Sequence, residues 1–165
     1  DAIKAVDFPP AYGADIVVSC EKAKDPKNGS IYLKPTQFVL GIGCRRDTAF
    51  ENIDRAIRQS LLKLQIDISD IDMIASIDVK KDEPGIKEFC DRNRIEFVTY
   101  TVDELMAVQG EFSASQFVKE HVGVDNVCER AAVLACSREC NKAGKLVYKK
   151  HKYDGVTVAA AKYPD

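Results

Sequence analysis

No stretch of this chain is apolar over anything near the ~20 residues that a helix needs to cross a bilayer. Its first residues also lack the basic start and the apolar core of a secretory signal peptide. Neither sign of charge is in large excess, because the chain has 24 Lys and Arg residues and 26 Asp and Glu residues, which gives a net charge of −2. These absences argue against a membrane protein and against a general nucleic-acid binder. We therefore expect a soluble protein of the reduced cytoplasm.

Metal-ligating patterns are equally sparse. The chain has six cysteines, but no two form a Cys-x-x-Cys pair, and its two histidines are His121 and His151. A zinc site needs several such ligands at short spacings, so we predict no protein metal site. Cys90, Cys128 and Cys136 fall in apolar helical patterns and are expected to be core residues.

What the chain does have, from residue 38 onward, is an alternation of strand and helix patterns. Strands are expected at 38–42, 71–77 and 95–100, and helices at 49–64, from Pro84, and at 102–108, 113–121 and 126–139. Two further strands, 145–150 and 155–161, flank a Tyr-Asp-Gly turn and predict a β-hairpin. Such alternation is typical of an α/β protein. We predict a three-layer α/β/α fold with a mixed, mostly parallel sheet and a carboxyl-terminal β-hairpin.

Residues 1–37 differ from this pattern. Proline and glycine punctuate them heavily, and only residues 14–20 predict a strand. The full length of 165 residues suits one domain with a short appendage. We interpret 1–37 as an edge element or the tail of a preceding region, and 38–165 as the main domain.

The segment 38–48 is the most informative part of the chain. A short apolar run ends in Gly41-Ile42-Gly43, two arginines follow at 45 and 46, and Thr48-x-x-Glu51 resembles a helix capping box. Backbone N–H groups at a helix start, with arginines beside them, form a receptor for anions. The alternative is a plain tight turn with solvent-exposed arginines. A nucleotide-binding turn fits poorly, because Arg46 replaces the third glycine of the dinucleotide pattern.

Two more segments are expected at the same edge of the sheet. Ser76 and Lys80 follow the second strand and could face the crevice, although Lys80 could equally be a solvated loop residue; Glu83 is interpreted as a cap of the next helix. Glu129 lies at another helix start, where it caps the helix or acts as an acid or base if burial raises its pKa. Ligands of such sheets bind beyond the carboxyl ends of the strands, so these helix starts would converge on one anion.

Four ordered blocks, at 41–46, 75–83, 123–132 and 155–159, resemble a known family. They are similar to the carboxyl-terminal domain of CbiG, the cobalt-precorrin-5A hydrolases of cobalamin biosynthesis, and to CobE, in which this domain occurs alone. The resemblance covers about residues 37–162. It implies that residues 1–37 belong to the end of the middle region of CbiG, and that the enzyme's amino-terminal domain lies outside this chain.

The resemblance also implies a reaction, the opening of a lactone on a cobalt-bound macrocycle with release of acetaldehyde. The substrate bears many acetate and propionate groups, which suits a cationic site. By position, the resemblance implies a set of substrate-binding residues: Gly41, Gly43, Cys44, Arg45, Arg46, Ser76 and Lys80. Glu129 is the catalytic candidate. The alternative function is a non-catalytic module that binds or carries the corrinoid precursor, as CobE would.

Cofactors and partners follow from the same resemblance. No cofactor is expected, because the cobalt lies within the substrate. The expected partners are the tetrapyrrole substrate and other enzymes of the pathway, and neither nucleic acid nor membrane. The chain departs from the family at Asp47, where glycine is frequent, and at Arg130, which replaces a commonly small residue. A negative charge at Asp47 should weaken anion binding unless this side chain caps the helix.

Overall fold

A computed structural model describes residues 16–18, 31–33, 38–113, 126–140 and 143–163. The chain divides into two compact units, Asp1–Thr36 and Gln37–Asp165. In the first unit, strand β1 (Ile16–Val18) pairs in parallel with strand β2 (Ile31–Leu33). The sequence predicted a strand around β1 but missed β2.

The second unit is built on a five-stranded sheet in the order β5-β4-β3-β7-β6. Its strands are β3 (Phe38–Cys44), β4 (Ile71–Ile77), β5 (Glu96–Tyr100), β6 (Lys145–Tyr153) and β7 (Val156–Lys162). Strands β3, β4 and β5 are parallel, whereas β7 runs antiparallel to both β3 and β6. The predicted mixed sheet with a carboxyl-terminal hairpin is therefore confirmed.

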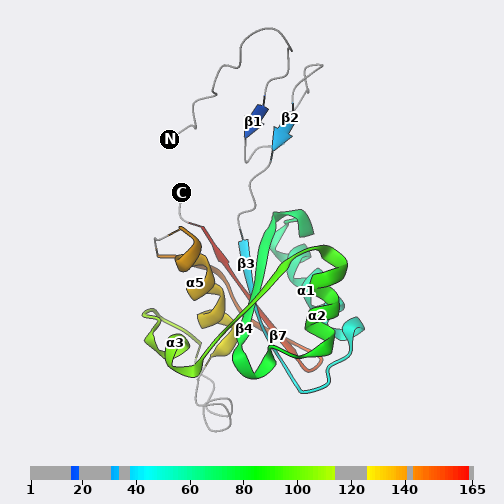
Figure 1. Ribbon diagram of the computed structural model, residues 1–165, viewed down its shortest axis with the longest axis vertical. Coiled ribbons are helices and arrows are strands. Elements are labelled where there is room, and N and C mark those ends of the chain that lie inside the picture. Colours follow the sequence, from blue (N-terminus) through cyan, green and yellow to red (C-terminus); the bar gives the residue numbers. More distant parts are fainter. Residues whose placement is uncertain (1–15, 19–30, 34–37, 114–125, 141–142, 164–165) are drawn as a thin grey trace. The chain divides into compact units, whose positions relative to one another are not determined.

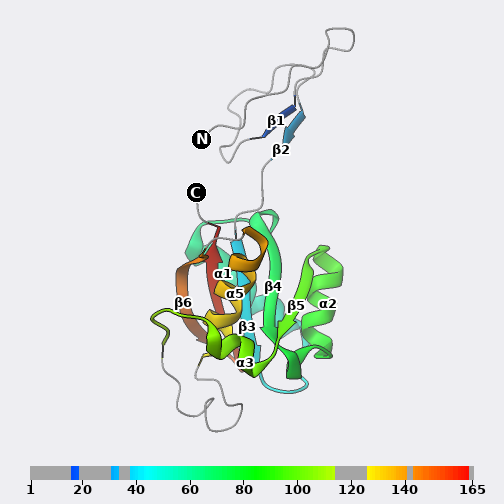
Figure 2. The same ribbon diagram turned by 60° about the vertical axis from the view of Figure 1, so that its left-hand side comes forward.

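Helices cover both faces of this sheet (Figure 1, Figure 2). The helices are α1 (Phe50–Leu64), α2 (Pro84–Asn93), α3 (Val102–Ala107) and α5 (Val127–Cys140), with short 3₁₀ turns at Ile68–Asp70 and Asp78–Lys80. Helices α1 and α2 pack on one face, and α3 and α5 pack on the other. This arrangement confirms the three-layer α/β/α prediction. The helix expected at 113–121 lies outside the described residues, except for Ser113.

Alternating side chains of the strands divide the interior into two cores. In β3, Leu40 and Ile42 point into the core under α1 and α2, whereas Val39 belongs to the core under α5. Gly41 has the same orientation as Val39, and a Cβ placed on it would lie 1.7 Å from the carbonyl oxygen of Cys128 in α5. Gly41 therefore permits the close approach of α5 to the sheet.

The helix starts agree only partly with the sequence patterns. Helix α2 has Pro84 at its beginning, as expected. The capping box at Thr48 and Glu51 is wrong, because the N-cap residue of α1 is Ala49 and no side chain caps it. The Thr48 hydroxyl instead donates a hydrogen bond of 2.7 Å to the carbonyl of Arg45. In α5, the Glu129 backbone N–H donates to Asn126 Oδ1 at 3.1 Å, so the asparagine does cap this helix.

The carboxyl edge of β3 collects several segments that lie far apart in the sequence. Helices α1, α2 and α3 begin just after β3, β4 and β5, and therefore start at this edge. The turn of the β6–β7 hairpin also lies there, since Val156 pairs with Cys44. Helix α5 starts at the same edge and β6 begins at the other, so α5 runs back across the sheet.

Candidate functional site

Two exposed cations of the carboxyl edge lie in the turn between β3 and α1. We call Arg45–Arg46–Asp47 the arginine turn; the side chains of all three residues are exposed. Within the described residues, neither guanidinium group makes an ion pair or a side-chain hydrogen bond. A guanidinium group without a protein partner is available for a carboxylate, which it can bind through two parallel hydrogen bonds.

The backbone of the arginine turn is fixed by its neighbours. The Arg45 N–H donates to the carbonyl of Gly155 in the hairpin turn at 3.1 Å. On the other side, the Thr48 hydroxyl donates to the carbonyl of Arg45. Asp47 adopts the left-handed conformation with φ of 57°, which glycine would adopt at a lower steric cost. Asp47 does not cap α1, so its negative charge stays beside the two arginines.

A buried carboxylate lies directly behind this turn. Glu83 accepts the backbone N–H of Thr48 through Oε1 at 3.0 Å and the Lys80 ammonium through Oε2 at 2.9 Å. The side chains of Glu83 and Lys80 are 5% and 15% exposed. Lys80, expected from the resemblance to bind substrate, thus already has a carboxylate partner within the protein. Sequence reasoning missed the role of Glu83, although an acidic residue three positions after a lysine at a strand end is a usable signal for such a pair.

Cys44 lies next to this ion pair at the end of β3. Its side chain is half-buried and packs against the core under α1 and α2. Burial raises the pKa of the Cys44 thiol, and the positive charge of Lys80 only partly offsets this effect. Cys44 is therefore a neutral thiol at neutral pH rather than a nucleophilic thiolate.

Ser76 is near this edge but has no exposed surface. Its hydroxyl donates a hydrogen bond of 2.7 Å to the carbonyl of Ile42 and so links β4 to β3. Ser76 therefore lies within the sheet, below the surface on which the arginine turn is exposed. Direct binding of substrate by this hydroxyl stays a prediction.

The two glycines proposed for ligand approach both contact protein. Gly41 faces α5, as described above. A Cβ on Gly43 would lie 2.7 Å from Thr157 Oγ1, and that hydroxyl donates to the Gly43 carbonyl at 3.1 Å. Both glycines therefore have a packing reason to lack a side chain, independent of any ligand.

Glu129 is fully buried in the first turn of α5 and accepts three hydrogen bonds. Its Oε2 accepts the backbone N–H of Ser113 at 2.8 Å, while Oε1 accepts the Ser113 hydroxyl at 2.8 Å and the backbone N–H of Lys150 at 2.6 Å. Burial alone would raise the pKa of Glu129, but these donors outweigh burial and hold the pKa below its usual value. The acid or base role was expected only if burial raised this pKa, and that condition is not met. Glu129 is an ionised carboxylate that ties α5 to two other segments.

The predicted residues therefore form two groups on opposite faces of the sheet. Cys44, the arginine turn and Lys80 lie together on the side of α1 and α2, and they share Glu83 and Thr48 as partners. Gly41 and Glu129 lie on the side of α5. Only the first group presents unpaired cations to solvent.

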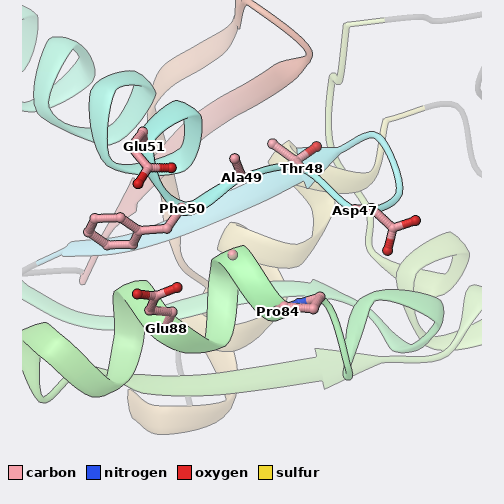
Figure 3. Close-up of a pocket in the computed structure, with 8 residues that line it drawn as sticks. Asp47, Thr48, Ala49, Phe50, Glu51, Pro84 and Glu88 are labelled. Atoms are coloured by element: carbon pink, nitrogen blue, oxygen red, sulfur yellow. The ribbon is translucent and has the colours of Figure 1, made fainter.

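A hollow of about 340 Å³ lies beside the arginine turn, between the starts of α1 and α2. The carboxylates of Glu51 and Glu88 lie on either side of it, and Asp47 lies at its other end (Figure 3). Three carboxylates would repel an anion from this hollow, despite the two helix N-termini. These charges make the hollow an unfavourable place for an anion, whereas the outward side of the arginine turn presents two exposed guanidinium groups.

Two features of the described residues bear on other kinds of site. In residues 38–113, 126–140 and 143–163, together with the short strands β1 and β2, no three His, Cys, Asp or Glu side chains are grouped so that they could hold a metal ion. No helix in those same parts of the chain is long and apolar enough to cross a membrane.

Comparison with known proteins identifies relatives of this domain. The chain is 33% identical over 137 residues to a probable cobalt-precorrin-5A hydrolase of Methanocaldococcus jannaschii, covering 80% of this chain and 42% of that protein. It is 33% identical over 126 residues to the cobalt-precorrin-5A hydrolase of Salmonella typhimurium, covering 76% of this chain and 34% of that protein. The chain thus spans less than half the length of either hydrolase.

A solved structure shares the fold. The crystal structure of CobE, a protein from the cobalamin (vitamin B12) biosynthetic pathway, superposes with a TM-score of 0.73 at 25% sequence identity, covering 78% of this chain and 92% of that one. The family model described as cobalamin synthesis G C-terminus matches residues 38–161. This chain therefore belongs to the family of cobalamin synthesis G carboxyl-terminal domains.

Proposed function

We propose that this chain is the carboxyl-terminal part of a protein of the cobalt-precorrin-5A hydrolase type, and that its arginine turn binds peripheral carboxylates of the corrin precursor. The observation that carries this proposal is the pair of exposed guanidinium groups at Arg45 and Arg46, which have no partner among the described residues. The names of the two hydrolases similar to this chain supply the substrate class.

The ligand chemistry fits these two side chains. Acetate and propionate groups project from the rim of a tetrapyrrole-derived macrocycle, so adjacent arginines can each meet a separate carboxylate. Because the turn is held by Gly155 on one side and by Thr48 on the other, the arginines start from a defined backbone. Preorganisation of this kind lowers the entropic cost of binding.

The proposed reaction of the whole protein is hydrolytic opening of the lactone on the cobalt-bound macrocycle, with release of acetaldehyde. Glu129 is poorly suited to act in it as an acid, because it is already ionised and accepts hydrogen bonds from Ser113 and Lys150. We therefore assign substrate binding to this domain and the proton transfers to the part of the protein outside it. The same observation favours the second candidate function, a binding module without chemistry of its own.

A comparison of binding with turnover separates the two functions. The chain alone, and the chain joined to the amino-terminal half of a related hydrolase, are incubated with cobalt-precorrin-5A, and released acetaldehyde is measured. We expect binding in both samples and acetaldehyde only from the longer protein. Release of acetaldehyde by the chain alone would show that this domain carries catalytic groups, and no turnover by either sample would leave the binding module as the function.

A further inference from the structure

A continuous series of contacts runs from the start of α2 to the hairpin turn. Lys80 pairs with Glu83, Glu83 accepts the Thr48 N–H, the Thr48 hydroxyl donates to the Arg45 carbonyl, and the Arg45 N–H donates to the Gly155 carbonyl. Each step is between 2.7 and 3.1 Å long. The arginine turn is therefore connected on its inner side to one buried carboxylate.

The position of Glu83 at the start of α2 does not explain where its carboxylate points. Glu83 is the N-cap residue of α2, yet its side chain makes no capping hydrogen bond to that helix. The carboxylate is directed instead to the backbone of the neighbouring turn, 35 residues earlier in the chain. The two segments are also in tight contact, since a Cβ on Gly85 would lie 2.2 Å from the carbonyl oxygen of Thr48.

We propose that Glu83, acting through Thr48, is a positioning residue that fixes the arginine turn in the conformation that binds carboxylates. This inference rests on the proposed function of the arginine turn. Glu83 does not touch the ligand in this account; it holds the backbone from which Arg45 and Arg46 extend. Lys80 serves as the counter-ion of Glu83 in its buried position.

The direction in which ligand affinity changes when Glu83 is removed distinguishes a positioning role from a purely electrostatic one. Glu83 is negatively charged and lies behind two cations, so its charge opposes the binding of an anion. If charge were its only influence, removing it would strengthen the binding of a polycarboxylate. Positioning predicts the opposite result, because a loosened turn must be ordered again when the ligand binds.

The test uses the whole chain and cobyrinic acid, a corrinoid whose peripheral side chains end in carboxylates. Affinity is measured by titration calorimetry for wild type, Glu83→Ala, Glu83→Gln and the matched control Asp82→Ala. We expect Glu83→Ala to weaken binding about tenfold, and Glu83→Gln to retain most of the affinity, since its carbonyl oxygen can still accept the Thr48 N–H. Asp82 is exposed and carries the same charge one residue away, so Asp82→Ala should leave affinity unchanged or slightly higher.

Glu83→Ala leaves Lys80 unpaired and could fail to fold for that reason. Two variants of Thr48 therefore test the same positioning role with Glu83 and Lys80 intact. Thr48→Val removes the hydroxyl bond to the Arg45 carbonyl at a partly exposed position, keeps the shape of the side chain and should fold normally. Binding should weaken in Thr48→Val and recover in Thr48→Ser. Residue-resolved amide hydrogen exchange at Thr48 gives a readout that needs no ligand: exchange should accelerate in Glu83→Ala and stay slow in Glu83→Gln.

The outcomes separate this inference from the proposed function. If wild type binds cobyrinic acid and both Glu83→Ala and Thr48→Val bind it equally well or more tightly, the positioning role is overturned while the arginine turn stands. If wild type does not bind at all, the proposed function fails. In that case, unchanged amide exchange at Thr48 in Glu83→Ala would also overturn the positioning role of Glu83. Faster exchange in that variant would show that Glu83 fixes the conformation of the turn even though no ligand binds there.

Discussion

Replacement of Glu129 should destabilise the domain rather than simply remove an acid or base. The carboxylate is buried at the point where α5, β6 and Ser113 meet, and it is the acceptor for two backbone N–H groups and one hydroxyl. Without it, these donors lose their partner in a partly buried environment. Each unsatisfied donor of this kind costs about 1–3 kcal/mol, so Glu129→Ala should lower the free energy of unfolding by about 3 kcal/mol.

Glu129→Gln should have an intermediate effect. The amide oxygen can still accept the Lys150 N–H and the Ser113 hydroxyl, but the amide nitrogen then faces the Ser113 N–H, donor against donor. One lost bond predicts a decrease of about 1–2 kcal/mol. Urea denaturation followed by circular dichroism measures both variants. The control is Glu88→Ala, which removes an exposed carboxylate that pairs with Arg92 in the same helix and should change stability by less than about 0.5 kcal/mol.

The pH dependence of stability gives a second signature of the same group. Because the folded-state pKa of Glu129 is lowered, its stabilising contribution is complete above the ordinary pKa of about 4.3 and is lost as pH falls through the folded-state value. The difference in stability between wild type and Glu129→Gln should therefore shrink below about pH 4. Equal stability of Glu129→Ala and wild type at pH 7, or a difference that grows on acidification, would refute this reasoning.

Three other predictions concern glycine packing, backbone strain and the buried serine. Gly41→Ala should cost about 3 kcal/mol, because its Cβ meets helix backbone, whereas Gly43→Ala, which meets a hydroxyl, should cost about 1 kcal/mol in the same denaturation assay. Asp47→Gly and the control Gln65→Gly, at a remote left-handed position, should both raise the melting temperature. Only Asp47→Gly should tighten cobyrinic acid binding, and equal affinities of the two variants would contradict this. Ser76→Ala should lose about 1 kcal/mol of stability with the hydrogen bond to Ile42. A large loss of affinity in this variant would assign the hydroxyl to the ligand, and unchanged affinity would leave it a structural role alone.

The fold was largely predictable from local patterns. Apolar periodicities located every strand and helix of the sheet domain that the structure describes, and Pro84 marked the start of α2. These signals are local, because the buried face of a helix has apolar residues three or four positions apart, and the buried face of a strand has them two positions apart. The hairpin was equally readable, since Gly155 takes the positive φ of 72° that its turn requires.

The partners of the site residues were not predictable in this way. Thr48 has the sequence pattern of a cap, but its hydroxyl bonds to the Arg45 carbonyl across the turn at Asp47. Glu83 accepts a hydrogen bond from a residue 35 positions away in the sequence, and Glu129 accepts hydrogen bonds from residues 16 and 21 positions away. Such pairings depend on how the layers pack, and neither helix periodicity nor a family resemblance contains that information.

The central claim is that Arg45 and Arg46 bind carboxylates of a corrin precursor, and calorimetric titration of cobyrinic acid into the Arg45→Ala/Arg46→Ala double variant tests it most directly. Since hydrogen bonds to charged groups contribute about 1.5–3 kcal/mol each, the account predicts a loss of at least about tenfold in affinity, with thermal stability unchanged. Arg55→Ala, which removes an exposed arginine from the middle of α1, should bind like wild type. Equal affinity of the double variant and wild type would contradict the account.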